Sequence, residues 1–208
     1  MSENARKPSI RFAGFDDAWE QRKLGDIGTT FTGLSGKSKE DFGHGDARFV
    51  TYMNVFTNPI SSQDMTENVE IDSRQNEVKY GDIFFTTSSE TPEEVGMSSI
   101  WLFKMPNVYL NSFCFGYRPN EKFDPYYLAF MLRSPVIRKN FSFLAQGISR
   151  YNISKNKVME MTVSIPKNDE QQQIGAFFQN LDNIIALHQR KLEKLKNIKK
   201  SMLEKMFV

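Results

Sequence analysis

The chain has 208 residues, which is enough for one domain of ordinary size and an extension. Its composition is globular, with 39% hydrophobic and 25% charged residues, and the net charge of +2 is too small to indicate a nucleic-acid partner by itself. The single cysteine, Cys114, excludes an intramolecular disulfide, and no apolar run approaches the ~20 residues of a membrane span. Because the N-terminus is polar and charged rather than a secretory signal, we expect a cytoplasmic protein that does not contact a membrane.

The first part of the sequence mixes strand and helix patterns. Residues 1–12 are polar and basic and are predicted to form a flexible arm. Short apolar or β-branched runs between turn-forming residues predict the strands Thr29–Thr32, Phe49–Phe56, Val69–Ile71, Ile83–Thr86, Ser98–Phe103, Ser112–Tyr117 and Met159–Ile165. One helix is predicted to begin at Asp124–Pro125 and a second covers Pro135–Leu144. Since no βαβ repeat is present, residues 1–166 are predicted to be an α+β (irregular α/β) domain.

The last part of the sequence, residues 167–208, predicts one long α-helix of the coiled-coil type. Pro166 prevents a helix from running in from upstream, and Asn168 with Gln171 three residues later has the spacing of a capping box. The helix would be roughly 57 Å long at ~1.5 Å per residue, far longer than an ordinary globular helix. Packing on its own domain is the simpler alternative, but such a helix would overhang the domain, so we expect it to pack against another helix.

Apolar residues on this helix follow the alternating three- and four-residue steps of a coiled-coil seam. The expected interface residues are Phe178, Leu181, Ile185, His188, Leu192, Leu195 and Met202. His188 is a polar member of the seam and is expected to fix its register. Cations crowd the C-terminal half of the helix, which suits the helix dipole and is also compatible with phosphate contact.

No catalytic or metal-binding pattern is found in the sequence. Gly36-Lys37-Ser38 lacks the spacing of a phosphate-binding P-loop. Asp124-Pro-Tyr-Tyr is similar to the Asp/Asn-Pro-Pro-Tyr signature of amino-group DNA methyltransferases, but the second proline is missing and a helix start explains each residue. His44 and His188 are isolated, and no Cys/His set has metal-ligand spacing. We therefore expect no catalytic residue, no metal and no cofactor.

Four loops combine small hydroxyls and amides with cations and aromatics, which are the residue types that contact base edges and phosphates. The expected DNA-binding residues are Ser35, Lys37, Ser38, Lys39, Tyr52, Asn54, Thr86, Thr87, Ser88, Ser89, Gln146, Ser149, Arg150 and Tyr151. Because surface loops are generally polar, ordinary solvated loops are the alternative interpretation.

Several segments resemble the specificity subunits of type I restriction–modification enzymes. They are residues 11–26 (Arg-Phe-Ala-Gly-Phe-Asp-Asp-Ala-Trp-Glu-Gln-Arg-Lys-Leu-Gly-Asp), Gly81-Asp-Ile-Phe-Phe, Arg150-Tyr-Asn-Ile-Ser, Glu170-Gln-Gln-Gln-Ile, the helical stretch 174–196 and Leu203-Glu-Lys-Met-Phe. The resemblance spans nearly the whole chain, and its helical part is the most specific.

This resemblance implies a non-catalytic reader of double-stranded DNA. Residues 1–166 would be a target recognition domain, and residues 167–208 a conserved helix that docks methyltransferase (modification) subunits, with a motor/restriction subunit joining through the complex. The resemblance implies that a complete specificity subunit contains two recognition domains and two helices in one chain, whereas this sequence has one of each. We therefore expect a half subunit that forms a homodimer and reads an interrupted palindrome. The alternative is a truncated half that acts as an interaction protein or inhibitor without reading DNA.

Overall fold

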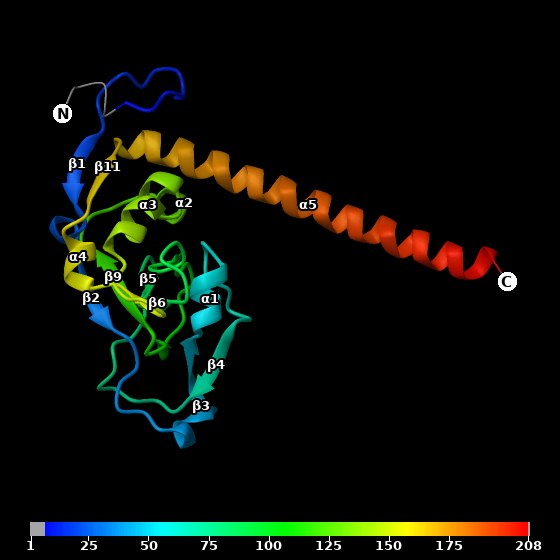
Figure 1. The fold of residues 1–208 in the computed structure, drawn as a ribbon, viewed down its shortest axis with the longest axis horizontal. Helices are drawn as coiled ribbons and strands as arrows, with labels where there is room; N and C mark the ends of the chain where they lie inside the picture. Colours follow the sequence, from blue (N-terminus) through cyan, green and yellow to red (C-terminus); the bar gives the residue numbers. More distant parts are fainter. Residues whose placement is uncertain (1–6, 208) are drawn as a thin grey trace.

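The computed structural model describes residues 7–207, which form a mixed α/β head and one long helix that leaves it (Figure 1). The predicted fold class, an α+β domain followed by a long C-terminal helix, is confirmed. Residues 1–6 of the predicted flexible arm lie outside the described residues.

The elements follow in an irregular order along the chain. The strands are β1 (Glu20–Lys23), β2 (Gly28–Thr32), β3 (Phe42–Val50), β4 (Thr66–Val69), β5 (Ile83–Thr86), β6 (Ser88–Ser89), β7 (Ser98–Ile100), β8 (Val108–Leu110), β9 (Cys114–Pro119), β10 (Tyr151–Asn152) and β11 (Thr162–Ile165). The helices are α1 (Tyr52–Thr57), α2 (Pro125–Leu132), α3 (Pro135–Leu144), α4 (Lys155–Met159) and α5 (Asn168–Met206).

A four-stranded antiparallel sheet in the order β2-β9-β5-β7 lies at the centre of the head. Its strand β5 is buried along its whole length. Because alternate side chains of a strand point to opposite faces, Ile83 and Phe85 enter the core beneath α2 and α3, while Phe84 enters a second core with Trp101. The continuous apolar run of this strand therefore reflects a sheet that is covered on both faces.

A second sheet, in the order β4-β3-β8, packs beside the first. Strands β3 and β4 are antiparallel, whereas β3 and β8 are parallel. The sequence-based strand Phe49–Phe56 is wrong, because β3 ends at Val50 and α1 begins at Tyr52. Thr51 caps this helix, since its side chain accepts a hydrogen bond from the backbone N–H of Asn54.

The remaining predictions are met to different degrees. The strand at Ile83–Thr86 and the helix Pro135–Leu144 have the expected bounds, and Asp124 caps α2 as predicted. The strand predicted at Val69–Ile71 lies earlier, as β4. Strand β1 was not predicted, because its residues are mainly polar and it exists only by pairing with β11, more than a hundred residues later.

Candidate recognition groove and assembly helix

Three of the four segments expected to bind DNA, Tyr52–Asn54, Thr86–Glu90 and Gln146–Tyr151, meet on one side of the head, and the first of them is the start of α1 rather than a loop. Strand β6 pairs with β10, with Ser89 opposite Tyr151. The hydroxyl of Tyr52 donates to the carbonyl of Ser88 at 2.9 Å and so ties α1 to the same place. Together they enclose a cleft of about 710 Å³, which we call the recognition groove; it is lined by Tyr52, Met53, Phe56, Ser88, Ser89, Glu90, Glu94, Ser149 and Arg150.

One wall of the recognition groove is held by an arginine from α3. The guanidinium of Arg138 donates to the carbonyls of Glu93, Val95 and Gly96 at 2.7, 2.6 and 2.7 Å. These bonds fix the loop that carries Glu94, whose carboxylate accepts from the Ser89 hydroxyl at 3.2 Å. Hydrogen bonds within the head therefore fix the position of this wall and of the Glu94 carboxylate.

The expected DNA-binding residues differ in how they are presented. Gln146, Ser149 and Arg150 are exposed, and Tyr52, Thr87 and Tyr151 are half-buried. Ser88 and Ser89 are each 8% exposed and reach the groove with only part of their surface.

Two of the expected residues point inward instead. Asn54 and Thr86 have fully buried side chains. The Asn54 amide donates to backbone carbonyls of the loop that follows α1, and the Thr86 hydroxyl accepts from the N–H of Met97. Both side chains therefore make hydrogen bonds within the head, and neither is exposed at the surface of the groove.

The fourth loop, Ser35–Lys39, lies apart from the recognition groove. The Lys37 ammonium is 3.2 Å from an Asp72 oxygen, and its side chain is only 10% exposed. Hydrogen bonds from Arg74, together with smaller contributions from Gln75 and Lys37, hold the pKa of Asp72 well below its ordinary range. The charge of Lys37 is thus already compensated within the head, whereas Ser38 and Lys39 are exposed.

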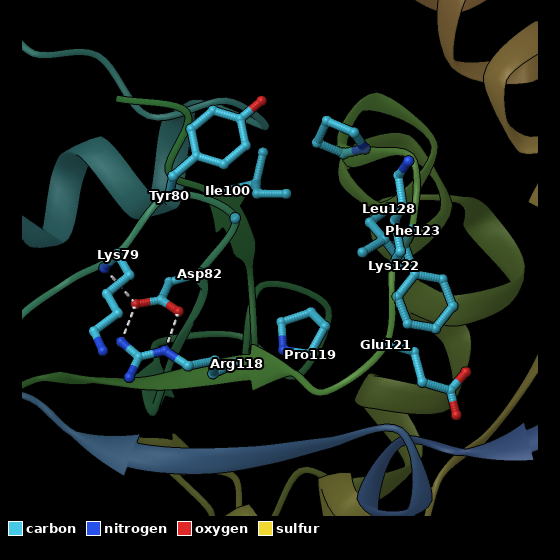
Figure 2. Close-up of a pocket in the computed structure, with 12 residues that line it drawn as sticks. Lys79, Tyr80, Asp82, Ile100, Arg118, Pro119, Glu121, Lys122, Phe123 and Leu128 are labelled. Atoms are coloured by element: carbon cyan, nitrogen blue, oxygen red, sulfur yellow. Dashed lines mark hydrogen bonds and ion pairs between the residues drawn. The ribbon is translucent and has the colours of Figure 1, made fainter. Parts of the chain in front are cut away.

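A smaller hollow lies at the other end of β5 (Figure 2). It has a volume of about 310 Å³, and the buried carboxylate of Asp82 lies on its wall. Both Asp82 oxygens accept from the Arg118 guanidinium at 2.7 Å, and one also accepts from the backbone N–H of Lys79 at 2.7 Å. Because Asp82 is paired with Arg118 and the other lining carboxylate, Glu121, with Arg22, the carboxylates of this hollow serve the fold.

Within residues 7–207, the long helix α5 contacts the head through its first turns. Phe178 packs against Phe130 of α2 with ring centroids 5.4 Å apart, and Phe177 packs against Phe12 at 5.8 Å. Farther along, the helix projects away from the head (Figure 1). Its large exposed apolar side chains, which we call the apolar stripe, are Phe177, Phe178, Leu181, Ile184, Ile185, Leu187, Leu192, Leu195, Ile198, Met202, Leu203 and Met206.

The first turn of α5 is fixed by tertiary contacts, and the predicted capping box is wrong. Lys167 is the N-cap residue, and no side chain caps the helix. Gln171 instead accepts from the backbone N–H of Asp124 at 3.0 Å, and Glu170, which is 1% exposed, binds Arg11. Sequence reasoning missed this ion pair because its partners lie at opposite ends of the chain.

Two further observations bear on the class of site. Among the described residues, no group of three or more His, Cys, Asp or Glu side chains is placed to hold a metal ion. None of the helices in residues 7–207 combines the length and the apolar character that crossing a membrane requires. In α5 the reason is its many charged residues.

Sequence comparison relates nearly the whole chain to one family. Residues 16–197 match the type I restriction modification DNA specificity domain. The chain is 28% identical over 215 residues to a protein of Methanocaldococcus jannaschii described as the specificity subunit of the type I restriction enzyme MjaX, an alignment that covers 99% of this chain and 48% of that protein.

Solved structures share the fold. A chain in a structure of a type I R-M system has a TM-score of 0.63 and 16% identity, covering 98% of this chain and 50% of that one. The HsdS subunit from Thermoanaerobacter tengcongensis has a TM-score of 0.60 and 17% identity, covering 94% and 47%. The chain thus spans about half the length of these relatives. Because the family match extends over most of its residues, this protein belongs to the type I restriction modification DNA specificity domain family.

Proposed function

We propose that this chain is a non-catalytic DNA-reading half of a specificity subunit, and that two copies associate through α5 to read an interrupted palindrome. The observation that carries the proposal is the apolar stripe. Its side chains are between 38% exposed, at Leu181, and 67% exposed, at Met206. An apolar surface of this length on a projecting helix is costly in water and is typical of a helix that packs on another helix.

The charge distribution along α5 favours an antiparallel pair. The C-terminal half contains seven cations, Arg190, Lys191, Lys194, Lys196, Lys199, Lys200 and Lys205, against Glu193 and Glu204. A parallel pair would bring both cationic halves together, which raises the electrostatic free energy. An antiparallel pair instead places the cations of one copy beside the first half of the other, which carries Asp169, Glu170 and Asp182 and no Lys or Arg. Such a pair is two-fold symmetric and closed, as most homodimers are.

The dimensions of the molecule suit a divided DNA site. Helix α5 has 39 residues, so it is about 58 Å long at ~1.5 Å per residue. The head lies at one end of this helix (Figure 1), so an antiparallel pair carries its two heads at opposite ends. Half-sites one DNA turn apart are separated by ~34–36 Å, a distance that a helix pair of this length can span.

The recognition groove supports the reading role of the head. Its hydroxyls, together with the exposed Gln146 beside it, are suited to base edges, and the Arg150 guanidinium is suited to guanine or phosphate. Glu90 and Glu94 are suited to accept from the amino group of cytosine. In this proposal methyl transfer belongs to methyltransferase subunits that dock on the paired helices, and translocation and cleavage belong to a motor/restriction subunit.

Footprinting of the complex with its modification subunit tests the proposal. We expect two protected half-sites related by two-fold symmetry, and a complex mass that contains two copies of this chain. The variant Leu192→Glu/Leu195→Glu serves as the control. A complex made with it is expected not to protect the two half-sites together. A single protected half-site at saturation would refute the dimeric reader.

The carboxylates that line the recognition groove favour a second candidate function. Glu90 and Glu94 repel phosphate, so a head that never approaches DNA is physically reasonable. The chain would then occupy modification subunits as an interaction protein or inhibitor. Binding of the reconstituted complex to DNA without any sequence preference would favour this function over the first.

A further inference from the structure

An open apolar pocket lies where α5 leaves the head. It has a volume of about 450 Å³, and we call it the root pocket; its apolar walls are Ile10, Phe12, Trp19, Ile174, Phe177 and Phe178. Phe12, Phe177 and Phe178 are 37%, 47% and 42% exposed, and Ile10 is 90% exposed. The root pocket is continuous with the apolar stripe, because Phe177 and Phe178 belong to both.

The far end of the same helix carries large apolar side chains that are uncovered in a single copy. Met206 is 67% exposed and Phe207 is 73% exposed. Helix α5 is continuous from Asn168 to Met206, so Met206 lies about 42 Å along the axis from Phe178 at ~1.5 Å per residue. These side chains therefore cannot reach the root pocket of their own copy.

A second copy can bring them there. The apolar stripe runs from Phe177 to Met206, and its midpoint lies close to Leu192. An antiparallel two-fold pair that buries the whole stripe has its axis near this residue. Met206 of one copy then lies level with Phe178 of the other, at the mouth of the root pocket, and Phe207 follows.

The charges around the two ends are complementary. Asp16 and Asp169 are exposed on the two segments that carry the root pocket, where Asp17 is paired with Lys167, whereas Lys199, Lys200 and Lys205 are exposed at the tip of α5. The tip of a second copy therefore approaches the root with an electrostatic attraction in addition to the burial of apolar surface.

We propose that the root pocket of each copy receives Met206 and Phe207 of the other copy. The inference rests on the dimer proposed above and adds a second contact to it: the tip of each helix binds the head as well as the helix of its partner. The segment Ile10–Phe12 thereby becomes part of the dimer interface. Since this segment also holds the first turn of α5, the contact fixes the angle between the two heads.

A cysteine pair tests the contact directly. Phe12 packs against Phe177 near the start of α5, whereas Phe207 follows the other end of the helix. A disulfide in the variant Phe12→Cys/Phe207→Cys can therefore form only between copies. Under mild oxidation of the full chain we expect a covalent species of two copies, closed by two disulfides. The native Cys114 is 3% exposed and does not compete. A ladder of higher species would indicate an open, non-closing assembly and would overturn the proposal.

The single variants Phe12→Cys and Phe207→Cys are the matched controls. Neither is expected to form a covalent dimer; a dimer from Phe207→Cys alone would place the two tips together, as in a parallel pair, and would overturn the inference. If the double variant sediments as a dimer without cross-linking, the root-pocket contact is wrong and the dimer itself stands. If it sediments as a monomer at all concentrations, the proposed dimer fails as well.

Truncation of the side chains provides a second measurement. In Met206→Ser/Phe207→Ser, each dimer loses the contact twice. We expect the dimer dissociation constant to rise on the order of 100-fold. The matched control, Asn183→Ser/Asn197→Ser, alters exposed residues of the same helix away from the apolar stripe and is expected to leave the constant within about 3-fold. Equal constants for the two variants would overturn the proposal.

Discussion

Arg11 and Glu170 are 159 residues apart in the chain and form a two-point ion pair at the start of α5. The distance from Nε to Oε1 is 2.6 Å and from Nη2 to Oε2 is 2.8 Å, and Glu170 is 1% exposed. Paired, parallel N–H···O bonds fix orientation as well as distance. The pair thus attaches the segment before β1 to the helix that we expect to set the geometry of the assembly.

Arg11→Ala is expected to destabilise the protein, because it leaves the buried Glu170 carboxylate without its partner. We expect the melting temperature to fall by roughly 3–6 °C, as measured by thermal unfolding. The neighbouring pair Asp17–Lys167 is the matched control, since it joins the same two segments but is 70% and 78% exposed. Asp17→Ala should change the melting temperature little; a comparable loss in both variants would contradict a special role for Arg11.

Gly175→Ala tests how closely α5 lies on α2. Alanine is favoured over glycine in a helix by about 1 kcal/mol. A Cβ at this position would lie 2.2 Å from Oδ1 of Asp124, which caps α2, and 2.9 Å from the backbone N of Tyr127. Overpacking of this kind costs about 1–3 kcal/mol, and displacing the cap costs about 1 kcal/mol more, so we expect a net loss of about 1–3 kcal/mol in denaturant unfolding. Gln173→Ala, at an exposed position of the same helix, should stay within about 0.5 kcal/mol; a stabilised Gly175→Ala would show that the helix lies farther from α2.

Leu192→Glu/Leu195→Glu places two carboxylates in the middle of the apolar stripe. Burial of unpaired charge opposes association, so we expect the dimer dissociation constant to rise at least roughly 100-fold and sedimentation to detect monomers. Asn183→Glu/Asn197→Glu adds the same charge at exposed positions on the opposite face of α5 and should still dimerise. Dimers that persist in the first variant would mean that α5 docks through a different face.

Arg150→Ala is expected to weaken DNA binding by the reconstituted complex. Arg150 is exposed at the recognition groove, and if it contacts phosphate, the slope of log K against log[salt] should become shallower by about 1. Lys37→Ala provides the comparison. Because the Lys37 ammonium is already paired with Asp72, this substitution should change the slope less. An unaltered slope for Arg150→Ala would remove this residue from the phosphate contacts.

Cys114 should be chemically inert in the folded protein. Burial raises its pKa to about 12, above the ordinary value, so the thiolate fraction at pH 8 is lower than for an exposed cysteine and rises only as the pH approaches 12. We expect maleimide labelling at pH 8 to be at least roughly 100-fold slower than at the cysteine of Asn183→Cys, an exposed position of α5 away from the apolar stripe. Unfolding in guanidinium should remove the difference. Fast labelling of the native protein would contradict the burial of this strand.

Local patterns in the sequence predicted the elements whose causes are local. The run Ile83–Thr86 identified a strand, and Asp124 followed by Pro125 identified the start of α2. The stretch 49–56 misled, because its β-branched and aromatic residues favour a strand while the cap at Thr51 begins a helix. The helix is held there by the Thr51 side chain, which accepts from the N–H of Asn54, and by the burial of Val55 in the core.

The sequence by itself determined that a mixed domain is followed by a long helix with an uncovered apolar stripe, because spacing, capping and proline placement act over a few residues. Only the tertiary structure decided which loops meet in the recognition groove, that Asn54 and Thr86 point inward, and that Arg11 holds Glu170. The groove and the Arg11–Glu170 pair join residues that are distant in the chain, and Asn54 and Thr86 bond to loops 8 and 11 residues away. Their formation depends on the packing of the whole head, and no pattern within a short segment encodes it.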